Sequence, residues 1–137
     1  MRRTLLAGVI CVCGLAVAPQ TLLAHHSFAA EYDANKPVTL KGKVTKVEWV
    51  NPHSWVHIDV AGPDGKVINW SCETAPPNIL YRQGWRPNSL KEGDEVTIDG
   101  FAAKDATATM TARSVTMANG KKMFAGSNTD GAPDSKK

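Results

Sequence analysis

The chain has 137 residues, of which 42% are hydrophobic, and a formal net charge of +3 at pH 7. Its first 24 residues have the pattern of a removable signal, so the mature chain would have 113 residues. Two of the 16 basic residues and none of the 13 acidic ones lie in that segment, which lowers the net charge to +1. These values exclude a second domain and a strongly basic surface for nucleic acid or anionic lipid.

The amino-terminal segment is typical of a secretory signal. Arg2 and Arg3 precede an apolar run from Leu5 to Ala18, which is too short to span a bilayer. Leu22 and Ala24 fit the −3 and −1 positions of a cleavage site, so we predict cleavage after Ala24. We expect ordinary secretion to the periplasm or the medium, with no membrane anchor after cleavage and with His25 as the new terminus.

The mature chain divides into three parts by composition. Residues 25–36 form an amino-terminal arm, residues 37–125 form a β-rich domain, and residues 126–137 form a polar tail that we predict to be disordered. Cys72 is the one cysteine outside the signal, so it has no intramolecular disulfide partner. We expect it to be a small buried residue on a strand.

Alternation of apolar and polar residues predicts the strands in chain order. The first is long, and its alternation slips by one residue near Gly42, which is typical of a β-bulge. Asn119 and Gly120 predict a tight hairpin turn into a final short strand. The predicted strands cover residues 38–50, 53–60, 67–73, 108–117 and 121–124, a turn and a further strand lie within residues 90–103, and a short helix falls within residues 75–85.

Three strands, a short helix and two more strands are the element order of an OB-fold, a small five-stranded Greek-key barrel. We therefore predict an all-β fold of this kind, with another small β-barrel or a sandwich as the alternative. The strand faces predict a common core, and they place Trp55 and His57 on the opposite face. The predicted core residues are Val44, Val56, Ile58, Ile68, Val96 and Ile98.

Three segments carry a resemblance to a known family: HHSFAAEYD, LKGKVTKVEWVNPHSWVHIDV and LKEGDEVTIDGF. Together they resemble the bacterial domain of unknown function numbered 6152, a family of small exported proteins. The resemblance covers the chain from His25 to about Phe124. It implies export and one β-rich domain, and it supplies no catalytic residues.

All four histidines lie between residues 25 and 57. If cleavage follows Ala24, the free amine and the imidazole of His25 can chelate one metal ion, and a second imidazole completes a histidine brace. Such nitrogen ligands favour copper, with zinc and nickel behind. Because the amine has a reference pKa of ~7.7–8.0, binding should strengthen as pH rises through that range. The alternative is a terminus whose histidines are simply solvated.

The second imidazole comes from His26 or His53. His53 and His57 share one strand face, but residues four apart on a strand lie about 13 Å from each other, too far for one ion. Asn51 and Pro52 predict a turn that holds His53 at the strand end. His53 is therefore the better candidate, and we expect His57 to hydrogen-bond a neighbouring side chain.

A rival hypothesis needs no metal. Trp55 and His57 on one exposed face could bind a sugar or peptide of the cell envelope, as the outer face of strands 2 and 3 does in OB-folds. The carboxylates Glu48, Asp59 and Glu73 are scattered over strands, and we expect all three to face solvent. No nucleophile elbow, phosphate loop or zinc-protease motif occurs, so we predict a binding module and not an enzyme.

Overall fold

The computed structural model describes residues 28–127. It begins with a short helix, continues with three strands, and has a second helix before the last three strands. Three strands, a helix and two more strands are therefore confirmed, followed by the predicted short hairpin strand. The elements are α1 (Phe28–Glu31), β1 (Tyr32–Glu48), β2 (Trp55–Ala61), β3 (Val67–Glu73), α2 (Pro77–Arg82), β4 (Glu95–Ala103), β5 (Thr109–Met117) and β6 (Lys122–Phe124).

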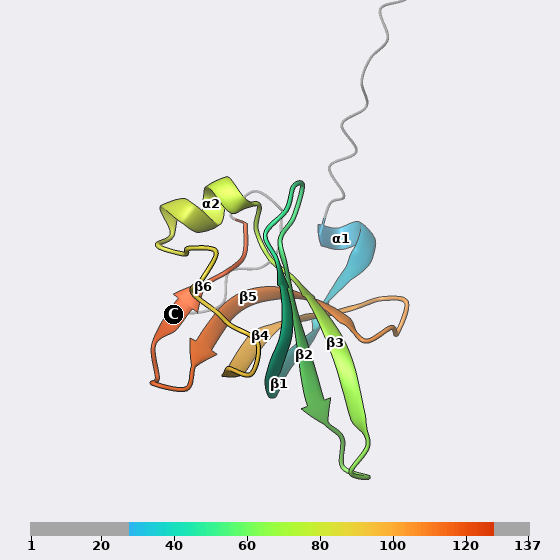
Figure 1. Cartoon of the computed structure of the whole chain (residues 1–137). Coiled ribbons are helices and arrows are strands. Elements are labelled where there is room, and N and C mark those ends of the chain that lie inside the picture. The colour runs from blue at the N-terminus through green and yellow to red at the C-terminus, as the bar shows by residue number, and fades with distance from the viewer. Residues whose placement is uncertain (1–27, 128–137) are drawn as a thin grey trace, which may run out of the picture.

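The strands form one sheet in the order β3-β2-β1-β4-β5-β6. A short parallel pairing of β3 with β5, from Ser71 opposite Thr109 to Glu73 opposite Thr111, joins the two ends of this order. Five strands thus form a closed ring, and β6 extends it beside β5 (Figure 1). The all-β prediction is confirmed.

β1 is long because it serves two neighbours. Its first part pairs with β4 and its last part with β2, and both pairings are antiparallel. Val44 lies opposite Ile58 but Lys46 lies opposite His57, so β1 has one extra residue between them. This is the predicted β-bulge, and it bends the strand between its two neighbours. The strand begins at Tyr32, six residues before the predicted start.

The main hydrophobic core fills the ring. Five of the six predicted core residues are buried, but Ile68 is 48% exposed, so that part of the prediction is wrong. β3 pairs with β5 only from Ser71 onward, and the β2–β3 hairpin extends beyond the ring (Figure 1). The buried members are Val44, Val56, Ile58, Val96 and Ile98, with Cys72, Met110 and Val115 among their neighbours.

A second, smaller hydrophobic cluster holds the beginning of the described chain. Phe28 of α1 contacts Tyr32 and packs edge-on against Phe101 of β4, and Ala103 completes the cluster. The helix α1 was not predicted. Within residues 28–127 no helix is long and apolar enough to cross a membrane.

Candidate functional site around Glu73

The turn between β1 and β2 positions His53. The turn contains a cis peptide bond between Asn51 and Pro52, and it lies at the same end of the molecule as α1 (Figure 1). The Nδ1 atom of His53 contacts Oε1 of Glu73, the last residue of β3. The side chain of His53 is 34% exposed, whereas Glu73 is buried. One imidazole at the surface is therefore held by a carboxylate from the interior.

The other oxygen of Glu73 is also occupied. The hydroxyl group of Tyr32, at the start of β1, donates a hydrogen bond to Glu73 Oε2. Burial raises the pKa of the Tyr32 phenol, and the neighbouring Glu73 carboxylate raises it further. The phenol therefore remains a hydrogen-bond donor throughout the neutral pH range. Tyr32, Glu73 and His53 form a continuous polar chain, which we call the Glu73 relay.

The Glu73 relay determines which nitrogen of His53 is free. A neutral imidazole has one N–H group and one nitrogen lone pair. Because Nδ1 faces a carboxylate, the proton belongs on Nδ1 and the lone pair is on Nε2. A histidine that binds a metal usually donates its other N–H group in this way, which orients the ring and raises its basicity. His53 thus has the form of a metal ligand or of a hydrogen-bond acceptor.

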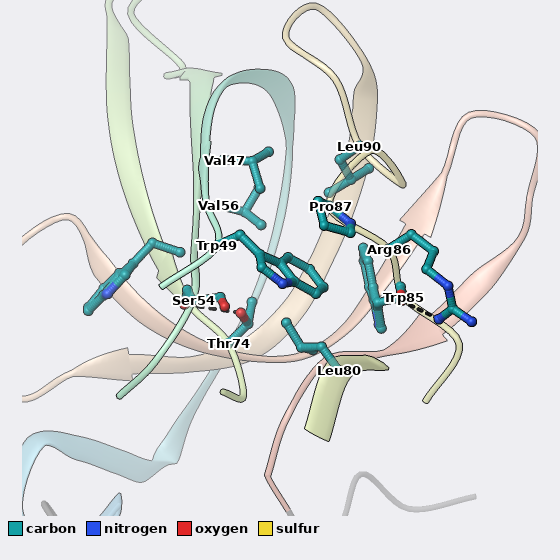
Figure 2. Close-up of a pocket in the computed structure, with 11 residues that line it drawn as sticks. Val47, Trp49, Ser54, Val56, Thr74, Leu80, Trp85, Arg86, Pro87 and Leu90 are labelled. Atoms are coloured by element: carbon teal, nitrogen blue, oxygen red, sulfur yellow. Dashed lines mark hydrogen bonds between the residues drawn. The ribbon is translucent and has the colours of Figure 1, made fainter. Parts of the chain in front are cut away.

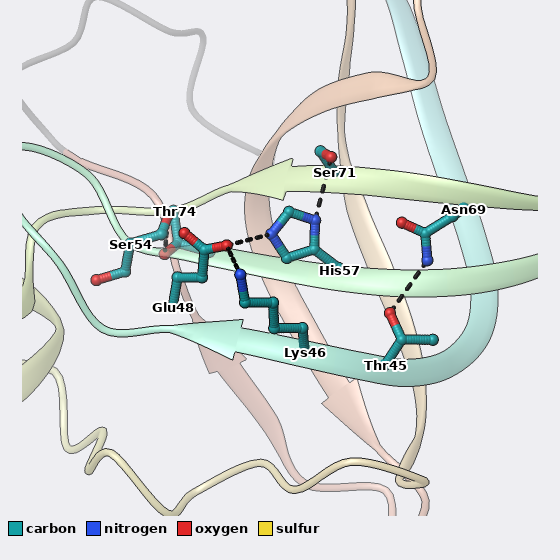
Figure 3. A network of polar contacts seen from close by, with 8 residues as sticks. All are labelled: Thr45, Lys46, Glu48, Ser54, His57, Asn69, Ser71 and Thr74. Atoms are coloured by element: carbon teal, nitrogen blue, oxygen red, sulfur yellow. Dashed lines mark hydrogen bonds and ion pairs between the residues drawn. The ribbon is translucent and has the colours of Figure 1, made fainter.

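His57 belongs to a different network on the outer face of β2. Its Nδ1 lies 3.1 Å from the hydroxyl of Ser71, and its Nε2 lies 3.3 Å from Glu48 Oε1 (Figure 3). Lys46 lies 2.5 Å from the same oxygen of Glu48. Hydrogen bonding from Lys46 is the largest cause that lowers the pKa of Glu48. His53, two residues before β2, and His57, within β2, therefore contact different carboxylates.

A cleft lies on the other side of the same turn. Trp55 is partly exposed and lines it, together with Trp49, Ser54 and Trp85, whereas His57 does not (Figure 2). Trp55 and His57 alternate along β2 with the buried Val56 and Ile58, so they lie on the same, partly exposed face of the strand. The lining of the cleft consists mainly of tryptophan and aliphatic side chains, with Ser54, Thr74 and Arg86 as its polar members.

A family model matches residues 12–112, which is most of the chain, and its description is a family of unknown function, DUF6152. The chain belongs to this family. The comparison with curated proteins found no match. Membership in DUF6152 is the relationship that the sequence resemblance predicted, and the Glu73 relay lies within the matched residues.

Sequence reasoning missed two members of the relay in this DUF6152 protein. Glu73 was expected to face solvent, but it is buried, so that prediction is wrong. Both Cys72 and Glu73 are buried at the end of β3, one toward the main core and the other toward Tyr32. The sequence analysis started β1 after Tyr32 and so overlooked this residue. A tyrosine buried on a strand needs a hydrogen-bond partner for its hydroxyl group, and that requirement could have pointed to a buried acceptor such as Glu73.

The two remaining metal candidates, His25 and His26, lie outside the described residues, as does the predicted signal. Within residues 28–127 no three His, Cys, Asp or Glu side chains lie close enough together to hold a metal ion.

At the carboxyl-terminal end of the described residues, Gly126 and Ser127 are buried, although the sequence assigned them to the tail. The guanidinium of Arg113 donates a hydrogen bond to the Ser127 carbonyl.

Proposed function

We propose that the mature protein is an exported metal-binding module that binds one copper(II) ion through the amine and imidazole of His25 and a further imidazole. The further imidazole comes from His53 or His26. The observation that carries the proposal is the contact of His53 Nδ1 with the buried carboxylate of Glu73. It holds the ring in place and leaves Nε2 for a metal.

Chain connectivity supports the participation of the terminus. Tyr32 and His53 contact the same carboxylate, and His26 precedes Tyr32 by six residues. Phe28 is anchored in the smaller hydrophobic cluster, so His26 is two residues from a fixed point. Because a residue extends the chain by at most about 3.6 Å, the terminal histidines stay close to Phe28 and so to the start of β1, where Tyr32 contacts the same carboxylate as His53.

The donor set supports copper over other metals. An amine and imidazoles are nitrogen ligands, for which copper(II) has the highest affinity among the divalent first-row metals. Zinc and nickel are the weaker alternatives. The proposed role is binding and not catalysis, in the periplasm or outside the cell, because the amino-terminal segment has the pattern of a cleaved signal.

The decisive experiment is a copper titration by calorimetry of protein that starts at His25 and of protein with one extra residue before it. The extension moves the amine away from His25 but keeps all four histidines, so we expect it to weaken binding at least about tenfold. Glu73→Gln should weaken binding about 10- to 100-fold if His53 is a ligand, because it removes the carboxylate that orients the ring.

His57→Ala is the matched control, because it removes a histidine that contacts Glu48 and Ser71 instead. It should leave the copper affinity unchanged. Equal affinities of the native and extended proteins would contradict the proposal. If Glu73→Gln and His53→Ala both bind copper as the native protein does, the further imidazole is that of His26.

A second candidate function is the binding of a ligand without metal. The observation that favours it is the position of Trp55 beside a cleft. Trp55 also shares the partly exposed face of β2 with His57, as this hypothesis requires.

A further inference from the structure

Strand β3 has an open edge along its first half, where the β2–β3 hairpin extends beyond the ring (Figure 1). The backbone N–H of Ser71 donates to the Ala108 carbonyl oxygen at 2.9 Å, and the pairing with β5 begins only at Ser71. Alternate residues of a strand direct their backbone groups to the same side, so those of Val67 and Asn69 also point away from β2. Within residues 28–127 no strand pairs with them on that side.

The side chains along this edge are apolar and exposed. Val67 is 61% exposed and Ile68 is 48% exposed, and both are β-branched residues, which favour strands. Natural edge strands are usually protected by their shortness, by lysine or proline, or by a bulge. The strand at the other end of the sheet order, β6, has three residues and begins with Lys122. Residues 67–70 contain neither lysine nor proline, and their register with β2 has no bulge, so this edge favours pairing with a further strand.

The free backbone groups match those of a second copy of the chain in one register. In an antiparallel pair, residues that point toward the partner strand lie opposite each other and exchange two hydrogen bonds. Val67 opposite Asn69 of the second copy, and Asn69 opposite its Val67, uses all the free groups and places Ile68 on a two-fold axis. A shift of two residues would require either Ser71, whose N–H is already bound, or Gly65, which lies in the turn with a φ of 78°.

The side chains fit the same register. The two Ile68 side chains meet across the axis, and the exposed Lys66 lies opposite the partly exposed Trp70 of the second copy. An ammonium group beside an indole ring is attractive, and no like charges lie directly opposite each other, which would be destabilising. We propose that β3 pairs with β3 of a second copy to form a two-fold symmetric dimer through residues 66–70. Five residues from each copy bury less than the ~1,000 Å² of a stable interface, so the dimer is weak and depends on concentration.

The first test is sedimentation velocity of the mature, metal-free protein, in which copper cannot bridge two chains. Between about 10 μM and about 1 mM we expect a shift from monomer to dimer, as for a weak interface. Ile68→Lys places two like charges opposite each other on the axis, so it should stay monomeric over this range. The matched control is Val50→Lys, at an aliphatic residue that is 46% exposed in the turn between β1 and β2, and it should dimerise as the native protein does.

The second test fixes the register by disulfide formation under mild oxidation, followed by non-reducing electrophoresis. Ile68→Cys places two thiols on the axis at a Cα separation of about 4.5 Å, which a disulfide can span. In Val67→Cys the two thiols lie on a diagonal of about 7–8 Å, so they should cross-link at least about tenfold more slowly, although Val67 is the more exposed residue. Cys72 is buried and should not contribute.

Three results would each overturn the proposal. They are a native protein that stays monomeric up to the highest concentration, an Ile68→Lys variant that dimerises as the native protein does, and a Val67→Cys variant that cross-links as fast as Ile68→Cys. A monomer throughout would leave the edge of β3 to a strand of another protein.

Discussion

At the scale of single residues, the Glu73 relay gives a buried carboxylate its two partners. A carboxylate removed from water must have hydrogen-bond partners, because an unpaired buried charge is strongly destabilising. Tyr32 and His53 supply one partner for each oxygen of Glu73. The relay therefore ties the start of β1 to the turn before β2, two segments that are 21 residues apart.

Tyr32→Phe tests this relay. The substitution keeps the ring in its cluster but removes the donor to Glu73, so we expect a loss of about 2 kcal/mol in the free energy of unfolding at pH 7. Above the ordinary tyrosine pKa of 10.0, the unfolded chain releases the Tyr32 proton and the folded chain keeps it, because burial and Glu73 raise the folded pKa. The native protein should therefore lose stability as pH rises above 10.

The measurement is denaturant unfolding between pH 7 and pH 11. Tyr32→Phe should lack the part of the alkaline loss that comes from this phenol. The control is Tyr81→Phe, at a tyrosine that is 55% exposed, and it should retain the alkaline loss. An identical alkaline profile for the native protein and Tyr32→Phe would contradict the assignment.

At the scale of elements, glycines mark where two strands come unusually close. A Cβ atom at Gly100 would lie 1.9 Å from the Thr111 carbonyl oxygen, and the β4–β5 register shifts at this point. A Cβ atom at Gly42 would lie 2.5 Å from the carbonyl oxygen of Asp59. Both neighbours are backbone atoms, which cannot rotate away. The bends of β1 and β4 therefore depend on residues without side chains.

Gly100→Ala should lower the free energy of unfolding by about 3 kcal/mol, because the backbones of β4 and β5 must separate to admit one methyl group. Gly62→Ala is the control in the β2–β3 hairpin, where a Cβ atom would lie 3.1 Å from Asp64 Oδ1 and 3.2 Å from the Lys66 carbonyl oxygen, both much farther than the nearest atom at Gly100. It should cost under about 1 kcal/mol. Thermal unfolding of both variants measures the difference, and similar melting temperatures would refute the account of close strand approach.

At the scale of the whole molecule, two separate hydrophobic clusters stabilise the fold. The main cluster lies inside the ring of strands, and the smaller one, around Phe28, fastens the beginning of the described chain to β4. The smaller cluster holds few residues, so its opening should require less energy than the unfolding of the ring.

Phe28→Ala should therefore loosen the start of β1 without unfolding the ring. Hydrogen exchange should accelerate at residues 32–39 and at residues 100–103, and it should stay slow at Val56 and Ile58. Ile98→Ala, in the main cluster, should cost about 2–5 kcal/mol and accelerate exchange throughout the chain. If Phe28→Ala accelerates exchange at Val56 and Ile58 as much as at residues 32–39, the two clusters unfold as one unit.

The sequence predicted the elements well because their signals are local. Alternation, a glycine near a slip in that alternation, and the Asn119-Gly120 turn each depend on a few neighbouring residues. The separate position of His53 was also predictable, because Asn51 and Pro52 indicate a turn that places His53 just before the strand that carries His57. The start of β1 was not, because the residues from Tyr32 to Pro37 do not alternate. They belong to the strand through pairing with β4 and through the contacts of Tyr32.

The sequence by itself therefore determined the all-β class, the order of the elements, most of the core and membership in DUF6152. The tertiary structure alone decided the burial of Glu73, the exposure of Ile68 and the cleft beside Ser54. The physical reason is that burial depends on what covers a residue. The pairing of β3 with β5 closes the ring, and Tyr32 covers Glu73 whereas Ile68 lies beyond the ring. A local sequence pattern does not show which distant segment will cover a given residue.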